Sequence, residues 1–238
     1  MQLDVLAFGA HPDDVEISAG GTMARLVSEG KKVGIIDLTR GELGSRGSGD
    51  LRMEEAKKAS DILGLSVREN LGMADGFFTH SEENLRKIIF MIRKYRPTIV
   101  FANSVSDRHP DHAKGAKLVS EACFLSGLRR IHTHDNGRLQ EHWRPKAVYH
   151  YVQDYYIEPH FVFDITSFFD VKMKSILAYS SQFYDPNSEE PETPISGKEF
   201  LGFLDARAQH MGRPAGYQYG EGFTVARAPG IHDFFSLD

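Results

Sequence analysis

Short apolar runs that alternate with helix-like segments restrict the fold of this chain more than any other feature. Residues 3–9 (LDVLAFG), 32–39 (KVGIIDLT) and 98–103 (TIVFAN) are apolar runs of strand length. Residues 51–64 and 81–96 lie between the second and third runs and repeat apolar residues at helical spacing. Apolar strands separated by helices indicate a parallel sheet that helices cover on both faces. The sequence therefore predicts an α/β fold.

The remaining elements are less regular. Further helices are predicted at 14–30, 111–126, 167–183 and about 196–211, and further strands at 67–73, 147–153 and 161–166. No internal repeat is present, and the polar loops at 40–50 and 184–197 are not placed to act as domain linkers. We therefore expect one domain that spans residues 1–238.

Charge and composition exclude several classes of function. Lys and Arg total 28 against 33 Asp and Glu, which gives a net charge of −5. This balance argues against a nucleic-acid binder that neutralises phosphates, and it leaves any anionic substrate to be bound by local arginines. No apolar stretch approaches the roughly 20 residues of a membrane span, and no signal sequence precedes the first strand. We expect a cytoplasmic protein without a membrane partner.

Two dense groups of polar residues follow predicted strands. GAHPDD (9–14) comes directly after the first strand, and DRHPDH (107–112) follows the strand at 98–103. A third polar loop, RGELGSRG (40–47), follows the second strand. Because ligands bind outside the carboxyl ends of the strands in open parallel sheets, we expect these three loops to meet at one edge of the sheet.

The residue types in these loops indicate a divalent metal ion. His11 and Asp14 are three residues apart, across a proline that suits the start of a helix. His112 occupies the matching place at another strand–helix junction. Two imidazoles and one carboxylate can hold a catalytic zinc with a position open for water, and the same set suits Fe2+. A single His-Pro-Asp is more often a loop or a helix cap, but two such groups at one edge favour a metal site.

Asp13, His109 and Asp111 lie beside the predicted ligands. A carboxylate near a metal-bound water can take its proton, so Asp13 is a candidate general base. His109 is a candidate proton donor to a leaving amine, and Asp111 could accept the other ring proton of His109. The sequence contains no GxGxxG after the first strand, no phosphate-binding P-loop and no GxSxG. A nucleotide-dependent enzyme and a serine hydrolase are therefore disfavoured.

Several short motifs resemble those of the LmbE-like N-acetylglucosaminyl deacetylases, also called the PIG-L group. The specific ones are AHPDD at 10–14, TRGELG at 39–44, Arg52 with Glu55, and HPDH at 109–112. Weaker matches are DIT at 164–166, SSQ at 180–182 and EGF at 221–223. The resemblance covers nearly the whole chain, and it implies a Rossmann-like fold and the hydrolysis of an N-acetyl group from a small GlcNAc conjugate.

The resemblance also implies a role for each motif residue. The zinc ligands are then His11, Asp14 and His112. Asp13 is then the general base, and His109, steered by Asp111, stabilises the oxyanion or protonates the amine.

Length and loops are most similar to the branch of the family that serves bacillithiol biosynthesis and deacetylates N-acetylglucosaminyl-malate. This similarity implies that Arg108, beside HPDH, binds the malate and that Arg52 holds the sugar. A guanidinium suits a carboxylate because it can donate two parallel hydrogen bonds. Members of the group often form homohexamers, which implies a homo-oligomer for this chain.

Three alternatives remain open from the sequence. A deacetylase of another GlcNAc substrate, such as diacetylchitobiose, has the same catalytic residues. A non-haem iron oxygenase also uses two histidines and one carboxylate, but it needs no second carboxylate such as Asp13. A non-catalytic sugar-binding or metal-sensing domain has no need for Asp13 and His109 beside the ligands.

Overall fold

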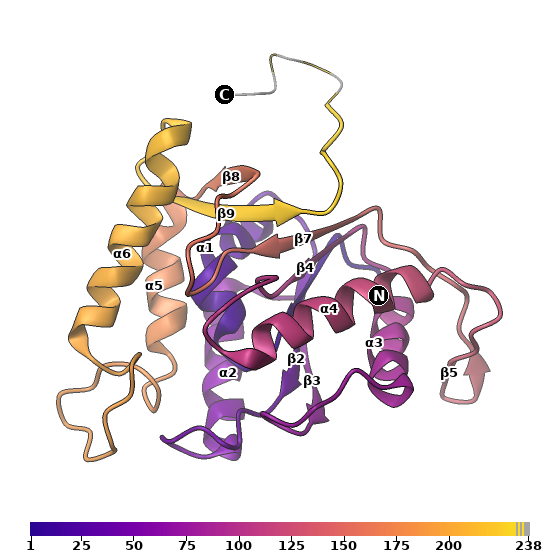
Figure 1. Ribbon diagram of the computed structural model, residues 1–238, viewed down its shortest axis with the longest axis horizontal. Helices are drawn as coiled ribbons and strands as arrows, with labels where there is room; N and C mark the ends of the chain where they lie inside the picture. The colour runs from indigo at the N-terminus through magenta and orange to yellow at the C-terminus, as the bar shows by residue number, and fades with distance from the viewer. Residues whose placement is uncertain (232, 234, 236–238) are drawn as a thin grey trace.

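A seven-stranded sheet forms the centre of the molecule (Figure 1). A computed structural model of the chain describes residues 1–231, 233 and 235. The strand order is β3-β2-β1-β4-β7-β9-β8. The strands are β1 Val5–Gly9, β2 Val33–Thr39, β3 Val67–Met73, β4 Ile99–Ala102, β7 Ala147–Tyr151, β8 Phe161–Asp164 and β9 Gly220–Val225, and β5 His134–Asp135 and β6 Arg138–Leu139 form a separate small hairpin. Strands β1, β2, β3, β4 and β7 are parallel, and β9 is antiparallel to both neighbours. The predicted α/β fold with a mostly parallel sheet is confirmed.

Helices cover both faces of this sheet. They are α1 Asp14–Ser28, α2 Gly49–Leu63, α3 Glu82–Tyr95, α4 Pro110–Leu125, α5 Phe169–Leu177 and α6 Lys198–Gly212, with short 3-10 turns at Thr166–Phe168 and Arg213–Ala215. Helices α3 and α4 contact each other on one side, whereas α1, α2, α5 and α6 gather on the other (Figure 1). Within the described residues, no helix is both long and apolar enough to span a membrane.

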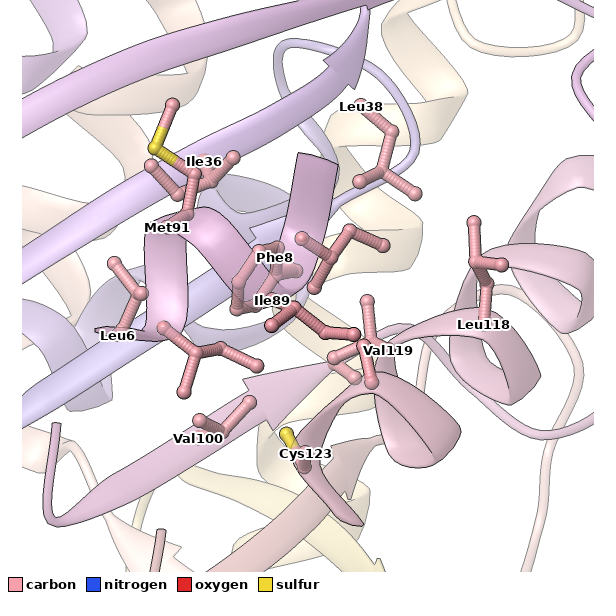
Figure 2. Packing of buried hydrophobic residues seen from close by; sticks show 14 of the residues in the cluster. Leu6, Phe8, Ile36, Leu38, Ile89, Met91, Val100, Leu118, Val119 and Cys123 are labelled. Atoms are coloured by element: carbon pink, nitrogen blue, oxygen red, sulfur yellow. The ribbon is translucent and has the colours of Figure 1, made fainter. Parts of the chain in front are cut away.

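The side of the sheet under α3 and α4 holds a continuous apolar core. Phe8 and Val100 point from the sheet toward Ile89 of α3 and toward Val119 and Cys123 of α4 (Figure 2). Burying a side chain of this size contributes about 1.5–3 kcal/mol to stability. Burial also raises the pKa of the Cys123 thiol, so its reactive thiolate is scarce at neutral pH.

Strand β9 was not predicted, because its sequence, GEGFTV, lacks an apolar run and lies in a Gly- and Tyr-rich tail. Packing explains its glycines. A Cβ atom on Gly220 would lie 2.5 Å from Val162, and one on Gly222 would lie 2.9 Å from Met211 and from Pro159. Because β8 and α6 pack closely against β9, only glycine fits at positions where a strand usually has branched apolar residues.

Glu221 of β9 ties the end of the chain to the middle of α1. Its Oε1 accepts a hydrogen bond from the backbone N–H of Gly21 at 3.0 Å, and its Oε2 accepts one from that of Thr22 at 2.7 Å. Lys172 of α5 is buried and donates to the same carboxylate at 2.5 Å. Because the two α1 partners are 200 and 199 residues from Glu221 in sequence, α1 depends on the C-terminal part of the chain for its position.

The strand order places a crevice beside β1. Strand β1 lies between β2 and β4, and the connections from β1 to β2 and from β4 onward run to opposite sides of the sheet. Such a switch point opens the sheet at the carboxyl ends of the two strands, where ligands bind in this class of fold. Residues 10–14 and 103–112 follow these two ends.

Candidate metal centre and active-site cavity

A cavity of about 380 Å³ lies at the carboxyl ends of the parallel strands. The loops after β1, β2 and β4 line it, as expected, and the loops after β3 and β7 and part of α6 complete its wall. The lining residues from the sheet loops include His11, Asp13, Asp14, Arg52, Asp75, Arg108, His109, His112, Gln153 and Asp154. The segment before α6 and α6 itself contribute Thr193, Pro194, Ile195, Phe200 and Arg207.

The three predicted metal ligands lie together. Asp14 Oδ2 is 3.6 Å from His11 Nδ1, and Asp14 Oδ1 is 3.1 Å from His112 Nε2. All three side chains are buried. Asp14 thus has one carboxylate oxygen near each of the two imidazoles, and two imidazoles with one carboxylate are a donor set of catalytic zinc sites, so the residues present fit a divalent cation.

Other donors surround this trio. Within the described part of the chain, His11, His109 and His112 offer ligand atoms within 4.8 Å of one another, and so do His11, Asp75 and Asp111. His11 belongs to both groups. The cluster can therefore hold a metal ion, although its donors outnumber the three that the sequence singled out.

The second ring nitrogen of His11 and that of His112, the two predicted histidine ligands, also have acidic partners. His11 Nε2 lies 3.0 Å from Asp75 and 3.5 Å from Asp111, and His112 Nδ1 lies 2.5 Å from Asp107. Carboxylates in this position fix the tautomer and the ring orientation of histidines that bind metals. Burial lowers the pKa of His112, but Asp14 and Asp107 outweigh it and raise the pKa to about 9.

Two neutral side chains that the sequence analysis missed hold the Asp14 carboxylate. Asn103 Nδ2 donates to Asp14 Oδ2 at 2.9 Å, and Gln153 Nε2 donates to Asp14 Oδ1 at 2.7 Å. Asn103 Nδ2 also donates to Gln153 Oε1 at 3.1 Å, which aims the Gln153 amide at Asp14. Both residues end predicted strands, at 98–103 and 147–153, so the rule that the carboxyl ends carry ligands could have found them.

Asp13 is held in a strained backbone conformation at the start of α1. Its φ is 114°, in the left-handed region that side chains other than glycine rarely adopt. Such strain is typical of residues whose direction matters for function. Burial raises the pKa of Asp13 to about 7, against the opposing charge of Arg52. A buried carboxyl group with this pKa can accept and release a proton near neutral pH.

Arg52 contacts Asp13 directly. Its Nη2 donates to Asp13 Oδ2 at 2.8 Å and to the Pro12 carbonyl at 2.9 Å, and Nη1 donates to the Gly41 carbonyl at 3.3 Å. The Arg52 guanidinium thus holds the Asp13 carboxylate and places a positive charge next to it. Arg52 also lines the cavity, so the expected contact with a sugar stays a prediction.

His109 caps the start of α4. Its Nδ1 accepts a hydrogen bond from the backbone N–H of Asp111 at 3.2 Å, so the neutral ring carries its proton on Nε2. Burial and the neighbouring His11 and His112 lower the pKa of His109, which favours the neutral ring. Its ring centre lies 4.6 Å from that of His11 and 5.1 Å from that of His112.

Asp111 has different partners from the expected one. Its carboxylate was expected to orient His109, but it lies 3.5 Å from His11 Nε2 and 2.5 Å from Lys114 Nζ, and it accepts the backbone N–H of Gly76 at 2.7 Å. Its position in the first turn of α4 turns the side chain toward the loop after β3. Asp111 therefore supports a candidate metal ligand, and it is its backbone N–H that bonds to His109.

Arg108 lies at the rim of the cavity. Its side chain is exposed and forms an ion pair with Asp154, which follows β7. Asp154 was not among the predicted site residues, although it too comes directly after a predicted strand. A contact of Arg108 with the substrate stays a prediction.

The fold and the site together define an α/β protein with a His/Asp cluster that can hold a metal ion and with a buried carboxyl group, that of Asp13, beside it. Comparison with known proteins identifies its family. The model of the PIG-L family, described as GlcNAc-PI de-N-acetylase, matches residues 6–123. A conserved protein of Thermus thermophilus has the same fold with a TM-score of 0.86 and 35% identity, over 98% of this chain and 99% of that one.

Two further relatives carry names that describe an activity. Diacetylchitobiose deacetylase of Thermococcus kodakarensis is 29% identical over 95% of this chain and 84% of its own length. The structure of N,N'-diacetylchitobiose deacetylase from Pyrococcus horikoshii matches with a TM-score of 0.80 and 27% identity, over 98% of this chain and 88% of that one. The chain belongs to the PIG-L, or LmbE-like, family, and the predicted class of hydrolytic N-deacetylase is confirmed.

Proposed function

We propose that this enzyme removes the N-acetyl group of a GlcNAc conjugate with the help of a divalent cation held by His11, Asp14 and His112. The observation that carries the proposal is the buried Asp13 carboxyl, with its pKa near 7, next to these donors. Zinc suits two imidazoles and a carboxylate, and ferrous iron suits the same set. The second carboxylate favours activation of water over an oxygenase reaction, because only hydrolysis needs a base at that place.

Each residue of the cluster has one task in this reaction. When bound, the cation polarises the amide carbonyl and acidifies water. Asp13 takes the proton of the attacking water, and the Arg52 guanidinium, 2.8 Å away, keeps Asp13 in place. His109 donates a hydrogen bond from Nε2 to the oxyanion, and Asp13 passes the proton that it took from the water to the departing amine. Asp111 contributes by orienting His11, which lies 3.5 Å from its carboxylate.

The substrate we propose is N-acetylglucosaminyl-malate, as in bacillithiol biosynthesis. Arginines at the cavity wall support an anionic aglycone, since a chain with a net charge of −5 attracts anions only locally. The second candidate is diacetylchitobiose, which gives its name to the relatives from Thermococcus kodakarensis and Pyrococcus horikoshii. A single domain, a cytoplasmic location and a homohexameric assembly stay predictions.

The test is acetate release from purified enzyme whose metal content is measured in the same sample. We expect about one divalent cation per chain and hydrolysis of N-acetylglucosaminyl-malate at least about tenfold more efficient than that of diacetylchitobiose. Faster hydrolysis of diacetylchitobiose would replace the malate conjugate as the substrate. No acetate from any GlcNAc compound in the metal-loaded protein would reject the proposed reaction.

A further inference from the structure

Three arginines line the cavity, and they differ in what already neutralises them. Arg52 is bound to Asp13, and Arg108 is paired with Asp154. Arg207, from α6, takes part in none of the ion pairs between residues of the described chain. It is therefore the cavity arginine whose charge no side chain among these residues neutralises directly.

The surroundings of Arg207 fix its side chain but leave most of its N–H donors without a protein acceptor in the described part of the chain. Its Nη2 donates one hydrogen bond, to the backbone carbonyl of Ile17 at 3.0 Å, and its guanidinium lies 5.2 Å from the ring centre of Phe203. Burial lowers the pKa of Arg207 to about 10, and Asp154, Glu221 and Asp107 act on it only as more distant charges. The group is still a cation at neutral pH, and its remaining N–H donors find no acceptor among residues 1–231.

The position of Arg207 suits the part of a substrate that lies beyond the sugar. Its anchor, Ile17, lies one turn of α1 beyond Asp14, which corresponds to about 5 Å along the helix axis. Both Ile17 and Arg207 line the same cavity as the metal-binding cluster. A conjugate with its N-acetyl group at the cluster can thus extend its aglycone toward α6.

We propose that Arg207 binds a carboxylate of the aglycone and so makes the enzyme selective for anionic GlcNAc conjugates. This inference rests on the proposed function and names the residue that chooses among its substrates. A half-buried guanidinium without a carboxylate partner can bind a carboxylate of the substrate without first breaking an ion pair. Arg108 must first exchange Asp154 for the ligand, and Arg52 must release Asp13.

The test compares two substrates in matched variants. Arg207→Gln removes the charge, Arg207→Lys keeps it without the planar fork, and Arg213→Gln removes an exposed charge just after α6 that does not line the cavity. The KM and kcat of each variant are measured for N-acetylglucosaminyl-malate and for the neutral methyl glycoside of GlcNAc. Inhibition of the neutral reaction by free malate gives an independent measure of anion binding.

In Arg207→Gln, we expect the KM for the malate conjugate to rise roughly 10- to 100-fold, as for the loss of a charged hydrogen bond. The KM for the neutral glycoside should stay within about twofold, and inhibition by malate should weaken in parallel. Arg207→Lys should lie between, and Arg213→Gln should match the wild type. If Arg207→Gln does not fold, Arg207→Lys still decides the matter by the ratio of the two KM values.

An equal change of KM for both substrates in the Arg207 variants, with malate inhibition unchanged, would overturn the inference. This result is separable from failure of the proposed function. The neutral glycoside reports deacetylation by itself, so a wild-type enzyme that releases acetate from it retains the proposed reaction whatever Arg207 does. A wild type inactive on both substrates rejects the reaction and, with it, the selectivity.

Discussion

The floor and the outer wall of the cavity are built in opposite ways. The floor, made of residues 11, 13, 14, 75, 112 and 153, joins the buried Asn103 and Asp111 in a network in which carboxylates, imidazoles and amides contact one another. The outer wall, made of residues 108, 193–195, 200 and 207, mixes apolar side chains with two arginines that meet few partners. Under the proposed function, this difference means that the reacting groups are held in place before the substrate binds, whereas recognition is left to side chains with spare donors.

The strongest test of this division is Asp13→Asn in the floor. The amide cannot accept a proton from water, so kcat should fall by about 10²- to 10⁴-fold, the usual contribution of general base catalysis. Metal content should stay near one per chain, because Asp13 is not among the proposed ligands. Acetate release and metal analysis of one sample check both. Asp50→Asn, at an exposed position on α2, is the matched control. Full activity of Asp13→Asn would remove Asp13 as the base.

The hydrogen bonds that hold Asp14 in the floor can be tested at Gln153. Loss of its hydrogen bond to Asp14 in Gln153→Ala should weaken metal affinity roughly 10- to 100-fold, as for other residues that orient a metal ligand. Competition with a chelator measures this without any assay of activity. Gln140→Ala is the control, since Gln140 bonds to the Phe90 carbonyl away from the cavity. Equal affinity in the two variants would show that Asp14 keeps its position without the amide.

Arg52 links Asp13 to the loop after β2, and its positive charge should affect the pH dependence of kcat/KM. Asp13 acts as a base when ionised, so kcat/KM falls as the pH drops below its pKa. The Arg52 charge lowers that pKa, and its removal in Arg52→Gln should therefore move the acidic limb to higher pH, by roughly one unit or more. Arg52→Lys keeps the charge and should move the limb less. A limb that stays in place in both variants would contradict the coupling.

The smallest effect is expected at the rim of the outer wall. Arg108 is exposed and paired with Asp154, so Arg108→Ala should raise the KM for the malate conjugate only about two- to fivefold, as for a solvated ion pair. The effect should shrink in high salt. Steady-state kinetics at two ionic strengths measure it. A loss as large as that in Arg207→Gln would make both arginines part of one binding site.

The sequence predicts the floor better than the wall, for a physical reason. His11, Asp14 and His112 lie in loops and helix starts that follow strands, and strand ends can be located from local apolar patterns. The same rule reaches Asn103 and Gln153, but neutral amides carry no chemical signal of their own. Arg207 lies in a helix whose docking against α1 depends on contacts almost 200 residues apart in sequence, and no local pattern encodes that. Strand β9 escapes prediction because close packing replaces its apolar residues with glycine.

The link from Glu221 to Gly21 and Thr22 bears on how the enzyme is made. The strand that fixes the middle of α1 is synthesised some 200 residues after that helix. A nascent chain therefore carries the proposed base and metal ligands at the start of α1 over that whole interval before the contact with Glu221 can form. The candidate site reaches its final geometry only after β9 has been added to the sheet.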